Sequence, residues 1–380
     1  MRAGDRALRR SAYNEAIANF SAGLKAAEAL LPSPEAMRHQ LDLLLKLGVA
    51  RGIVHGMQSA AAEEAYRRAA EIAENLGDGD AAYRAKWGLW LNANLGRRTA
   101  LARDQAQELV RLAQRSGDGD LLLEAYHCRW STAIFRGEVA SAIADGSLGI
   151  ESYDLTRHRH LGIAFGGHDP GVCAHVCSSL ALQMAGDRER SKDLQARGLA
   201  LAETLDHPNT IAHALYNIAM GHQMARDHEA TAYCAQRALT LAEKFGLQAW
   251  RASSLLLLAW AGTGTAEAAR LIDTEIDSAT RVGPVPQVYL GLAGEVLLAV
   301  GRSADGLAYL DDAIAGIDEP GVGLYLPEIY RLRGECLLAI DRGNKEQARQ
   351  AFTTAADIGR RQGAILFQRR AEASLEKLVG

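Results

Sequence analysis

The chain has 380 residues, of which 48% are hydrophobic and 6% aromatic, with 37 glycines and 8 prolines. This composition is typical of a folded chain rich in alanine and leucine, and it excludes the collagen-like, disordered and disulfide-stapled classes. The formal net charge of -4 and the pI near 6.3 predict no basic face. We therefore expect neither nucleic acid nor a membrane as a direct partner.

The cellular location is predicted from the absence of targeting signals. No apolar run reaches the roughly 18 to 20 residues that span a bilayer. The first residues, Met1-Arg2-Ala3-Gly4, lead into an amphipathic stretch without the apolar region of a signal peptide. The cysteines are odd in number and scattered, which is typical of buried thiols in a reducing compartment. We expect a cytoplasmic protein without a disulfide framework.

Taken in chain order, glycine and proline breaks recur after amphipathic stretches that have helical spacing of apolar residues. These breaks are Gly77-Asp78, Gly117-Asp118, His207-Pro208, Gly246, Gly283-Pro284, Pro320-Gly321 and Gly363. Most neighbouring breaks are about 40 residues apart, which is within the range of helical-pair repeats. A further glycine divides most of these units, as Gly96, Gly137 and Gly186 do. The pattern predicts a helical hairpin repeated along the chain.

Small residues flank a larger one at helical steps of four and three in several second helices. Examples are Ala62, Tyr66 and Ala69 near the start and Ala348, Phe352 and Ala355 near the end. Such residues share one helical face, where small side chains let the paired helix approach closely. This pattern resembles the second helix of tetratricopeptide (TPR) repeats, although the unit here is longer than the usual length of about 34 residues.

The predicted fold class is all-α, a right-handed superhelical solenoid of about nine TPR-like helix-turn-helix pairs with a C-terminal capping helix. The pairs are expected at residues 1–31, 34–77, 79–117, 119–153, 169–206, 208–245, 247–282, 284–319 and 322–362, and the capping helix at about 364–378. We expect one continuous solenoid with an N-terminal block (1–152), an insert (153–168) and a C-terminal block (169–380). The insert is either part of a functional site or a spacer that adjusts the superhelical twist.

Two stretches carry a resemblance to a known family. HDPGVCAHVCSSLALQMAGDRERS at 168–191 and PEIYRLRGECLLAI at 327–340 resemble the C-terminal TPR-like helical region of bacterial multidomain regulators. Those regulators combine an adenylate/guanylate cyclase domain, a STAND-type ATPase and a helical tail. The resemblance implies a role in signalling or transcriptional regulation, with a cyclase or ATPase module as a possible partner.

No catalytic motif accompanies this resemblance. The sequence contains no GxxxxGK[ST] phosphate loop and no GxSxG nucleophile elbow. We also find no strand-borne pair of aspartates that could hold the two metal ions of a cyclase. We therefore predict that the chain is not an enzyme and needs no cofactor.

A metal site formed by Cys173, His175 and Cys177, joined by His168 and Asp169, is a hypothesis that the sequence does not favour. Cys173 and Cys177 share a helical face, whereas His175 points about 200° away from Cys173, so these three cannot converge on one ion. A second group, His207, His213, His222 and His228, lacks the i,i+4 spacing of a helical ligand pair. We expect no metal and interpret the cysteines as small core residues.

The remaining function is recognition along the concave surface, which the first helices line in TPR-like arrays. Aromatic, histidine, asparagine and arginine residues on these helices are candidates for partner binding, because aromatic residues and arginine are enriched at binding hot spots. The candidates are Trp87, Trp90, His127, Trp130, His168, Tyr216, Asn217, Trp250, Tyr289, Tyr330 and Arg331. For each aromatic residue, core packing is the alternative interpretation.

We therefore expect a scaffold or regulatory domain that binds a protein or peptide segment. The alternative is a small-molecule sensor, in which a ligand held near the insert changes the curvature of the superhelix.

Overall fold

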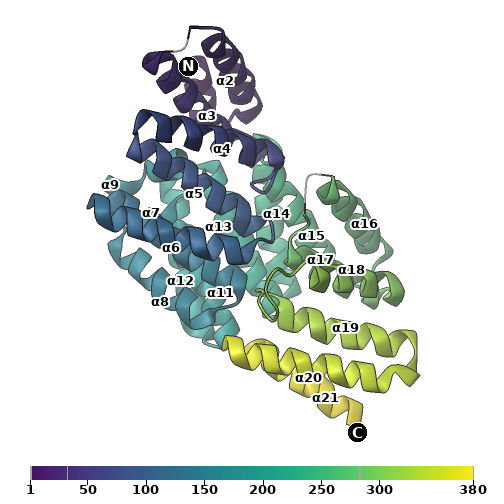
Figure 1. Cartoon of the computed structure of the whole chain (residues 1–380). Helices are drawn as coiled ribbons and strands as arrows, with labels where there is room; N and C mark the ends of the chain where they lie inside the picture. The colour runs from purple at the N-terminus through teal and green to yellow at the C-terminus, as the bar shows by residue number, and fades with distance from the viewer. Residues whose placement is uncertain (1, 32, 282–283, 380) are drawn as a thin grey trace.

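The computed structural model describes residues 2–31, 33–281 and 284–379. Every regular element within these ranges is a helix, which confirms the all-α prediction. The predicted break at Gly283 lies outside the described residues. Figure 1 shows the helices stacked side by side along the chain, with the two termini at opposite ends of the array.

The helices form consecutive antiparallel pairs that confirm the TPR-like solenoid. The pairs are α1 (Arg2–Arg9) with α2 (Tyr13–Glu28), α3 (Pro34–His55) with α4 (Ala60–Leu76), α5 (Gly79–Leu95) with α6 (Thr99–Ser116), α7 (Gly119–Arg136) with α8 (Val139–Ser152), α11 (Pro170–Ala185) with α12 (Arg188–Leu205), α13 (Pro208–Met224) with α14 (His228–Phe245), α15 (Gln248–Ala261) with α16 (Ala266–Thr280), α17 (Gln287–Ala299) with α18 (Ser303–Ala315), and α19 (Leu326–Ile340) with α20 (Lys345–Gln362).

Three short elements and a last helix complete the array. The segment between α8 and α11 contains α9 (Leu155–His158) and α10 (Leu161–Ala164), and a 3-10 turn, η1 (Arg342–Asn344), precedes α20. The last helix, α21 (Ile365–Val379), packs against α19 and α20 and also touches α11. It covers the open end of the final pair, as a capping helix does in repeat arrays.

Glycine followed by aspartate ends one helix and starts the next at several joints. Gly77 and Gly117 adopt the left-handed conformation that terminates a helix, with φ of 65° and 70°. The adjoining Asp78 and Asp118 then accept hydrogen bonds from the first free backbone N–H groups of α5 and α7. The two residue types thus fix a tight turn between consecutive pairs, which explains why the breaks were readable from the sequence.

Each set of small residues that flanks a larger one on a second helix forms what we call a small-large-small seam. Its large residue packs against a glycine on a first helix. The buried ring of Tyr66 on α4 lies against Gly48 of α3 and Gly88 of α5, where a Cβ atom would overlap it. Phe352 on α20 lies against Gly334 of α19 in the same way. The glycines let the paired helices approach closely, and the ring fills the space between them, as dense packing requires.

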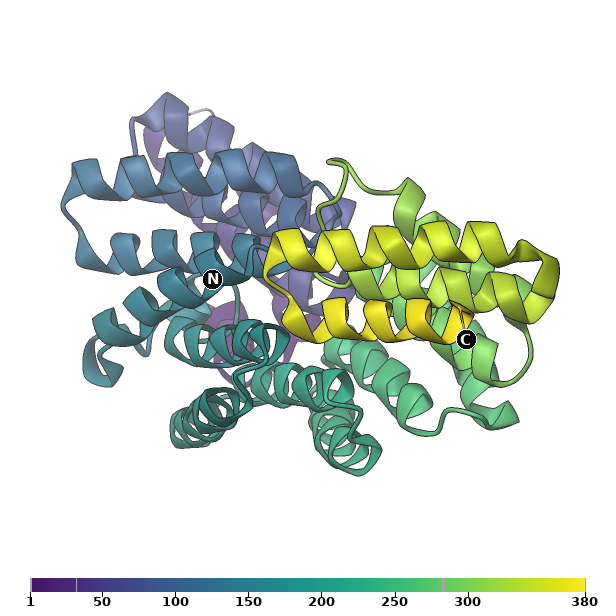
Figure 2. The ribbon, with the colours of Figure 1, turned by 90° about the horizontal axis from the view of Figure 1, so that it is seen from below.

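The superhelix winds tightly enough for distant parts of the chain to touch. The loop between α18 and α19 reaches the end of α7, where the N–H groups of Gly323 and Leu324 donate to the carbonyls of Arg136 (3.1 Å) and Phe135 (2.9 Å). We call this segment, residues 316–324, the closing loop. Figure 2 shows the N-terminal helices, in blue, on one side and the C-terminal helices, in green and yellow, on the other, with the teal helices joining them.

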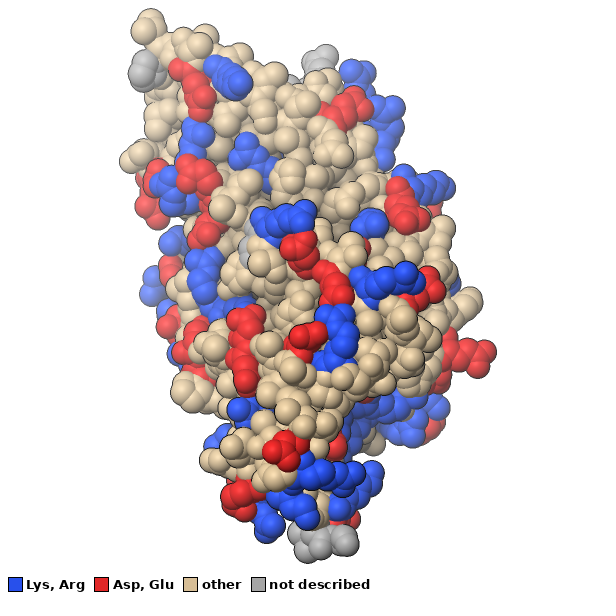
Figure 3. Space-filling view, turned by 90° about the vertical axis from the view of Figure 1, so that its right-hand side faces the viewer, with Lys and Arg blue, Asp and Glu red and all other residues tan. Residues whose placement is uncertain are grey.

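Helix α11 lies at the centre of this arrangement. It packs against α7, α8, α12 and α13 as well as α21, and nearly all of its side chains are buried. In the part of the chain that the structure describes, no helix is both long and apolar enough to cross a membrane. On the face shown in Figure 3, basic and acidic side chains are interspersed among uncharged ones.

Candidate binding cavity

A cavity of about 640 Å³ lies on the inner side of the superhelix. Its wall is built mainly from the first helices α7, α11, α13 and α15, together with the end of α3 and the turn after it, the end of the second helix α16, and Pro286, Val288 and Tyr289. Leu324 of the closing loop contributes to the wall, so the contacts that close the superhelix also bound the cavity. Its volume lies in the range of about 300 to 1,000 Å³ that is usual for ligand pockets.

The lining residues of α7, α11 and α13 recur at helical spacing, so each of these helices turns one face to the cavity. Helix α13, for example, contributes His213, Tyr216, Asn217 and Met220, which are separated by steps of three, one and three. Steps of three and four keep side chains on a single face of a helix. The first helices therefore point a continuous strip of side chains inward, as expected for the concave surface of a TPR-like array.

One part of the cavity wall is a chain of hydroxyl groups. The hydroxyl of Tyr289 is hydrogen-bonded to the Ser253 hydroxyl and to that of Tyr216. Burial raises the pKa of Tyr216 well above its usual value and also raises that of Tyr289. Both side chains therefore stay neutral at physiological pH, where they offer hydrogen bonds without charge.

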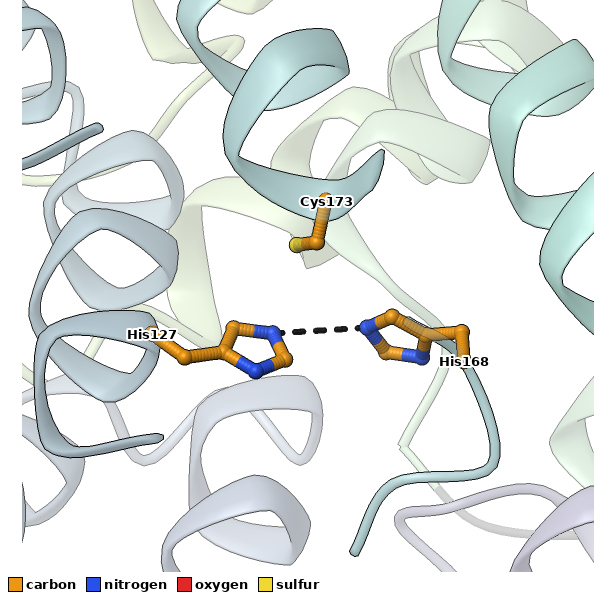
Figure 4. A group of neighbouring side chains, drawn as sticks. All are labelled: His127, His168 and Cys173. Atoms are coloured by element: carbon orange, nitrogen blue, oxygen red, sulfur yellow. Dashed lines mark hydrogen bonds between the residues drawn. The ribbon is translucent and has the colours of Figure 1, made fainter. Parts of the chain in front are cut away.

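A neighbouring part of the wall is a histidine and cysteine cluster, drawn in part in Figure 4. The rings of His168 and His213 are stacked, with centroids 4.1 Å apart and planes 14° apart. The Nε2 atoms of His168 and His127 are 3.4 Å apart, and the sulfur atoms of Cys173 and Cys177 are 3.6 Å apart. These five residues come from α7, α11, α13 and the residue just before the N-cap of α11.

Burial shifts the pKa values of His213 and Cys173 in this cluster. It lowers the pKa of His213 well below its usual value, and charge on His168 and His127 would lower it further, so His213 is neutral at pH 7. Burial also raises the pKa of the Cys173 thiol to about 11. A protonated thiol is a poor nucleophile.

Two buried carboxyl groups, those of Glu124 and Asp169, lie near the cluster. Glu124 is 1% exposed and its Oε2 atom lies 3.1 Å from Nδ1 of His127. Asp169 is 2% exposed, caps α11 through the N–H of Val172, and accepts a hydrogen bond from Tyr153 at 2.8 Å. Burial raises the pKa of Glu124 well above its usual range, and the nearby Asp169 raises it further. No lysine or arginine among the described residues forms an ion pair with either group.

The structure places the predicted partner-binding residues in three environments. Six of them line the cavity: His127, His168, Tyr216, Asn217, Trp250 and Tyr289. Trp87, Trp90 and Trp130 are buried in the core of the N-terminal half and do not line it. Arg331 is paired with Glu328 at 2.8 Å within α19, and Tyr330 packs beside α20, so neither belongs to the cavity wall.

The sequence-based candidates did not include several residues that line the cavity. Ser131 of α7 lies four positions after His127 and Ser253 lies three after Trp250, so helical spacing from the named candidates could have found them. Cys173, Cys177 and His213 were considered only beside their neighbours in the sequence. Their approach to His127 and His168 depends on how α7, α11 and α13 pack, which spacing along one helix does not reveal.

Comparison with known proteins gives a fold and one uncharacterized relative. No family model matches the sequence. The chain is 26% identical over 331 residues to a protein described as "Uncharacterized protein R02095" from Rhizobium meliloti (strain 1021), and this match covers 85% of the chain. The chain spans about a third of the length of that relative, 32%.

Among solved structures, the chain is similar to a Rap protein complexed with competence and sporulation factor. That similarity has a TM-score of 0.53 at 13% identity and covers 99% of this chain and 96% of the Rap chain. The apo form of the quorum sensor NprR from B. thuringiensis is more distant, with a TM-score of 0.44 at 13% identity over 81% of each chain. At such low identity the likeness establishes the TPR-like helical fold alone.

Proposed function

We propose that this chain is a non-catalytic regulatory scaffold whose inner cavity binds a segment of a partner protein. The cavity carries the proposal, because it is bounded by inward faces of successive first helices and combines apolar surface with a few fixed polar groups. Asn217 and the Tyr216–Tyr289–Ser253 hydroxyls can hydrogen-bond to peptide groups, while Ile134, Leu180 and Met220 can cover apolar side chains.

The partner that we propose is a cyclase or ATPase module of a bacterial signalling protein. This part of the proposal is supported by the resemblance of residues 168–191 and 327–340 to the helical tails of such regulators. The Rhizobium relative is much longer than the region matched, which leaves room in that protein for other modules. Nothing in this role requires a nucleophile.

The experiment fills the cavity without removing any of its contacts. Ala252 on α15 lines the cavity and is partly exposed, so Ala252→Trp places a large ring there. Ala232 on α14 is also partly exposed but does not line the cavity, which makes Ala232→Trp a matched control. Peptides selected from a random library on the wild-type chain are then titrated against each variant by fluorescence polarisation, with melting temperatures measured in parallel.

Ala252→Trp should weaken peptide binding at least tenfold, about 1.4 kcal/mol, because the ring occupies the space the peptide needs. Ala232→Trp should bind as the wild type does. If Ala252→Trp melts normally and binds with wild-type affinity, whereas Ala232→Trp does not bind, the partner uses the outer surface and the proposal is wrong.

The alternative function, a small-molecule sensor, is favoured by one observation, the pocket-like size of the cavity. A thermal-shift screen against nucleotides, sugars and peptides separates the two, because a ligand of the native state raises its apparent stability by mass action. A rise with a nucleotide or a sugar, and none with peptides, would favour the sensor.

A further inference from the structure

The histidine and cysteine cluster on the cavity wall brings three metal-ligand atoms together from separate parts of the chain. His127 lies on α7, Cys173 lies in the first turn of α11, and His168 immediately precedes the N-cap of α11. One nitrogen from each histidine and the sulfur of Cys173 all lie within 4.8 Å of one another. In Figure 4 the two imidazole rings face each other and the thiol of Cys173 lies above the gap between them.

The spacing of these atoms suits a tetrahedral ion. With metal–nitrogen bonds of about 2.0 to 2.1 Å, two nitrogen ligands at tetrahedral positions lie about 3.3 Å apart. The observed separation between the Nε2 atoms of His127 and His168 is 3.4 Å. An ion could therefore be bound between the two rings with little movement of either.

The surroundings orient His127 as a ligand. Its Nδ1 atom faces the buried carboxyl of Glu124 at 3.1 Å, so an Nδ1–H group can donate to that carboxyl and leave the Nε2 lone pair directed at His168 and Cys173. A carboxylate behind a histidine is the usual second layer of zinc sites, where it fixes the tautomer of the ligand.

We propose that His127, His168 and Cys173 bind a zinc-like divalent cation on the cavity wall, with its fourth position open to the cavity. Imidazole and thiolate are ligands that Zn²⁺ accepts, and three protein ligands with an open position are typical of sites that bind a further group. Cys177 and His213 form a second group with Cys173 within 4.8 Å. Cys173 belongs to both groups and is therefore the residue whose loss is most informative.

This site is independent of the proposed partner, because metal binding is measured on the chain alone. The wild-type chain, stripped with a chelator, is titrated with Zn²⁺ by calorimetry and with Co²⁺ by absorption spectroscopy, in which a thiolate ligand gives a charge-transfer band. Cys173→Ser removes the sulfur and His168→Gln removes the half-exposed imidazole, while Cys234→Ser on α14 is the control for a buried cysteine elsewhere.

The wild type and Cys234→Ser should bind one ion with the charge-transfer band and melt at a higher temperature when zinc is present. Cys173→Ser should lose the band, and both Cys173→Ser and His168→Gln should bind zinc at least about a hundredfold more weakly, because second-layer changes alone cost about 10- to 100-fold. Glu124→Gln should weaken zinc binding by about 10- to 100-fold. If folded wild type binds neither ion, or if Cys173→Ser retains wild-type zinc affinity, the site does not exist as proposed.

Discussion

Asp318 accepts a hydrogen bond from the hydroxyl of Thr99 at 2.8 Å, although 219 positions separate the two residues. The same carboxylate accepts from the N–H of Ala100, at 2.9 Å, in the first turn of α6. Arg98, the residue at the N-cap position of α6, makes no side-chain capping bond. The closing loop thus caps a helix in the opposite half of the chain, which couples closure of the superhelix to the stability of α6.

Asp318→Ala should loosen the closing loop and the start of α6 together. Loss of an N-cap costs about 1 kcal/mol, so hydrogen exchange should accelerate in residues 317–324 and in the first turn of α6. Asp193→Ala, which removes an exposed partner of Arg197, is the control and should leave both regions unchanged. Faster exchange in the loop alone would show that the capping contact does not support α6.

A second long-range contact is the ion-pair network around Glu328 of α19. Its side chain is fully buried and contacts Arg331 at 2.8 Å, Arg226 at 2.5 Å and Arg370 at 3.6 Å. Burial alone would raise the pKa of Glu328, but Arg331, Arg370 and Arg226 together outweigh it and lower the pKa to about 2. Because the folded-state pKa lies below the unfolded one, this group stabilises the fold at pH values above about 4.5.

That stabilisation, roughly 3 kcal/mol, should be lost as the pH falls from about 4.5 towards 2. Glu328→Gln should destabilise the protein by about 3 to 5 kcal/mol at neutral pH, since it leaves buried arginines without their carboxylate. It should also flatten the pH dependence of urea unfolding between pH 4.5 and 2. Glu346→Gln, at an exposed pair with Arg349, should change stability by less than about 1 kcal/mol.

A substitution in the last small-large-small seam should at first destabilise only the helices next to it. Phe352 is 1% exposed and packs against Gly334, so Phe352→Asp buries a charge between α19 and α20. Hydrogen exchange should accelerate in α19–α21 before it does so in α3–α6, because each repeat mainly touches its neighbours. Equal acceleration at both ends would mean that the closed superhelix unfolds as a single unit.

Substitutions at Trp130 and Tyr216 distinguish a role in core packing from a role in partner binding. Trp130 is fully buried and donates to the sulfur of Cys173 at 3.5 Å, so Trp130→Ala should cost about 3 to 5 kcal/mol of folding free energy. Tyr216→Phe removes only a hydroxyl from the cavity wall. It should melt within a few degrees of wild type and weaken binding of the selected peptides, as polarisation would measure. Unchanged affinity in Tyr216→Phe would remove that hydroxyl from the binding surface.

The order and length of the helices could be predicted from the sequence because local residues determine them. Glycine and aspartate at the joints, such as Gly77-Asp78, combine a left-handed helix end with an N-cap, and the Tyr66 seam repeats at helical spacing. Interactions between helices far apart in the chain were not predictable in this way. The Asp318–Thr99 bond depends on how tightly nine pairs wind, and small changes in each pair add up along a superhelix.

The residues of the site were hard to predict for the same reason, because their positions depend on how tightly the helix pairs wind. For each aromatic residue on a first helix the sequence leaves partner binding and core packing open. The tight winding buries Trp87 and Trp90 between α5 and its neighbours and leaves Tyr216 and Trp250 at the cavity. His127 lies about 40 positions before His168 and Cys173, so only packing of α7 against α11 brings it to them. The assignment of individual partner-binding residues therefore stays a prediction.

The measurement that tests the central proposal most directly is hydrogen exchange of the whole chain with and without a peptide selected from the random library. A peptide in the cavity should protect the backbone of α13 and α15 and of the closing loop, because these elements supply wall residues such as Tyr216, Ala252 and Leu324. The second helices α12 and α14, which contribute no residue to the cavity wall, should exchange as in the free chain. Protection confined to those second helices, with α13 and α15 unchanged, would contradict a partner-binding cavity.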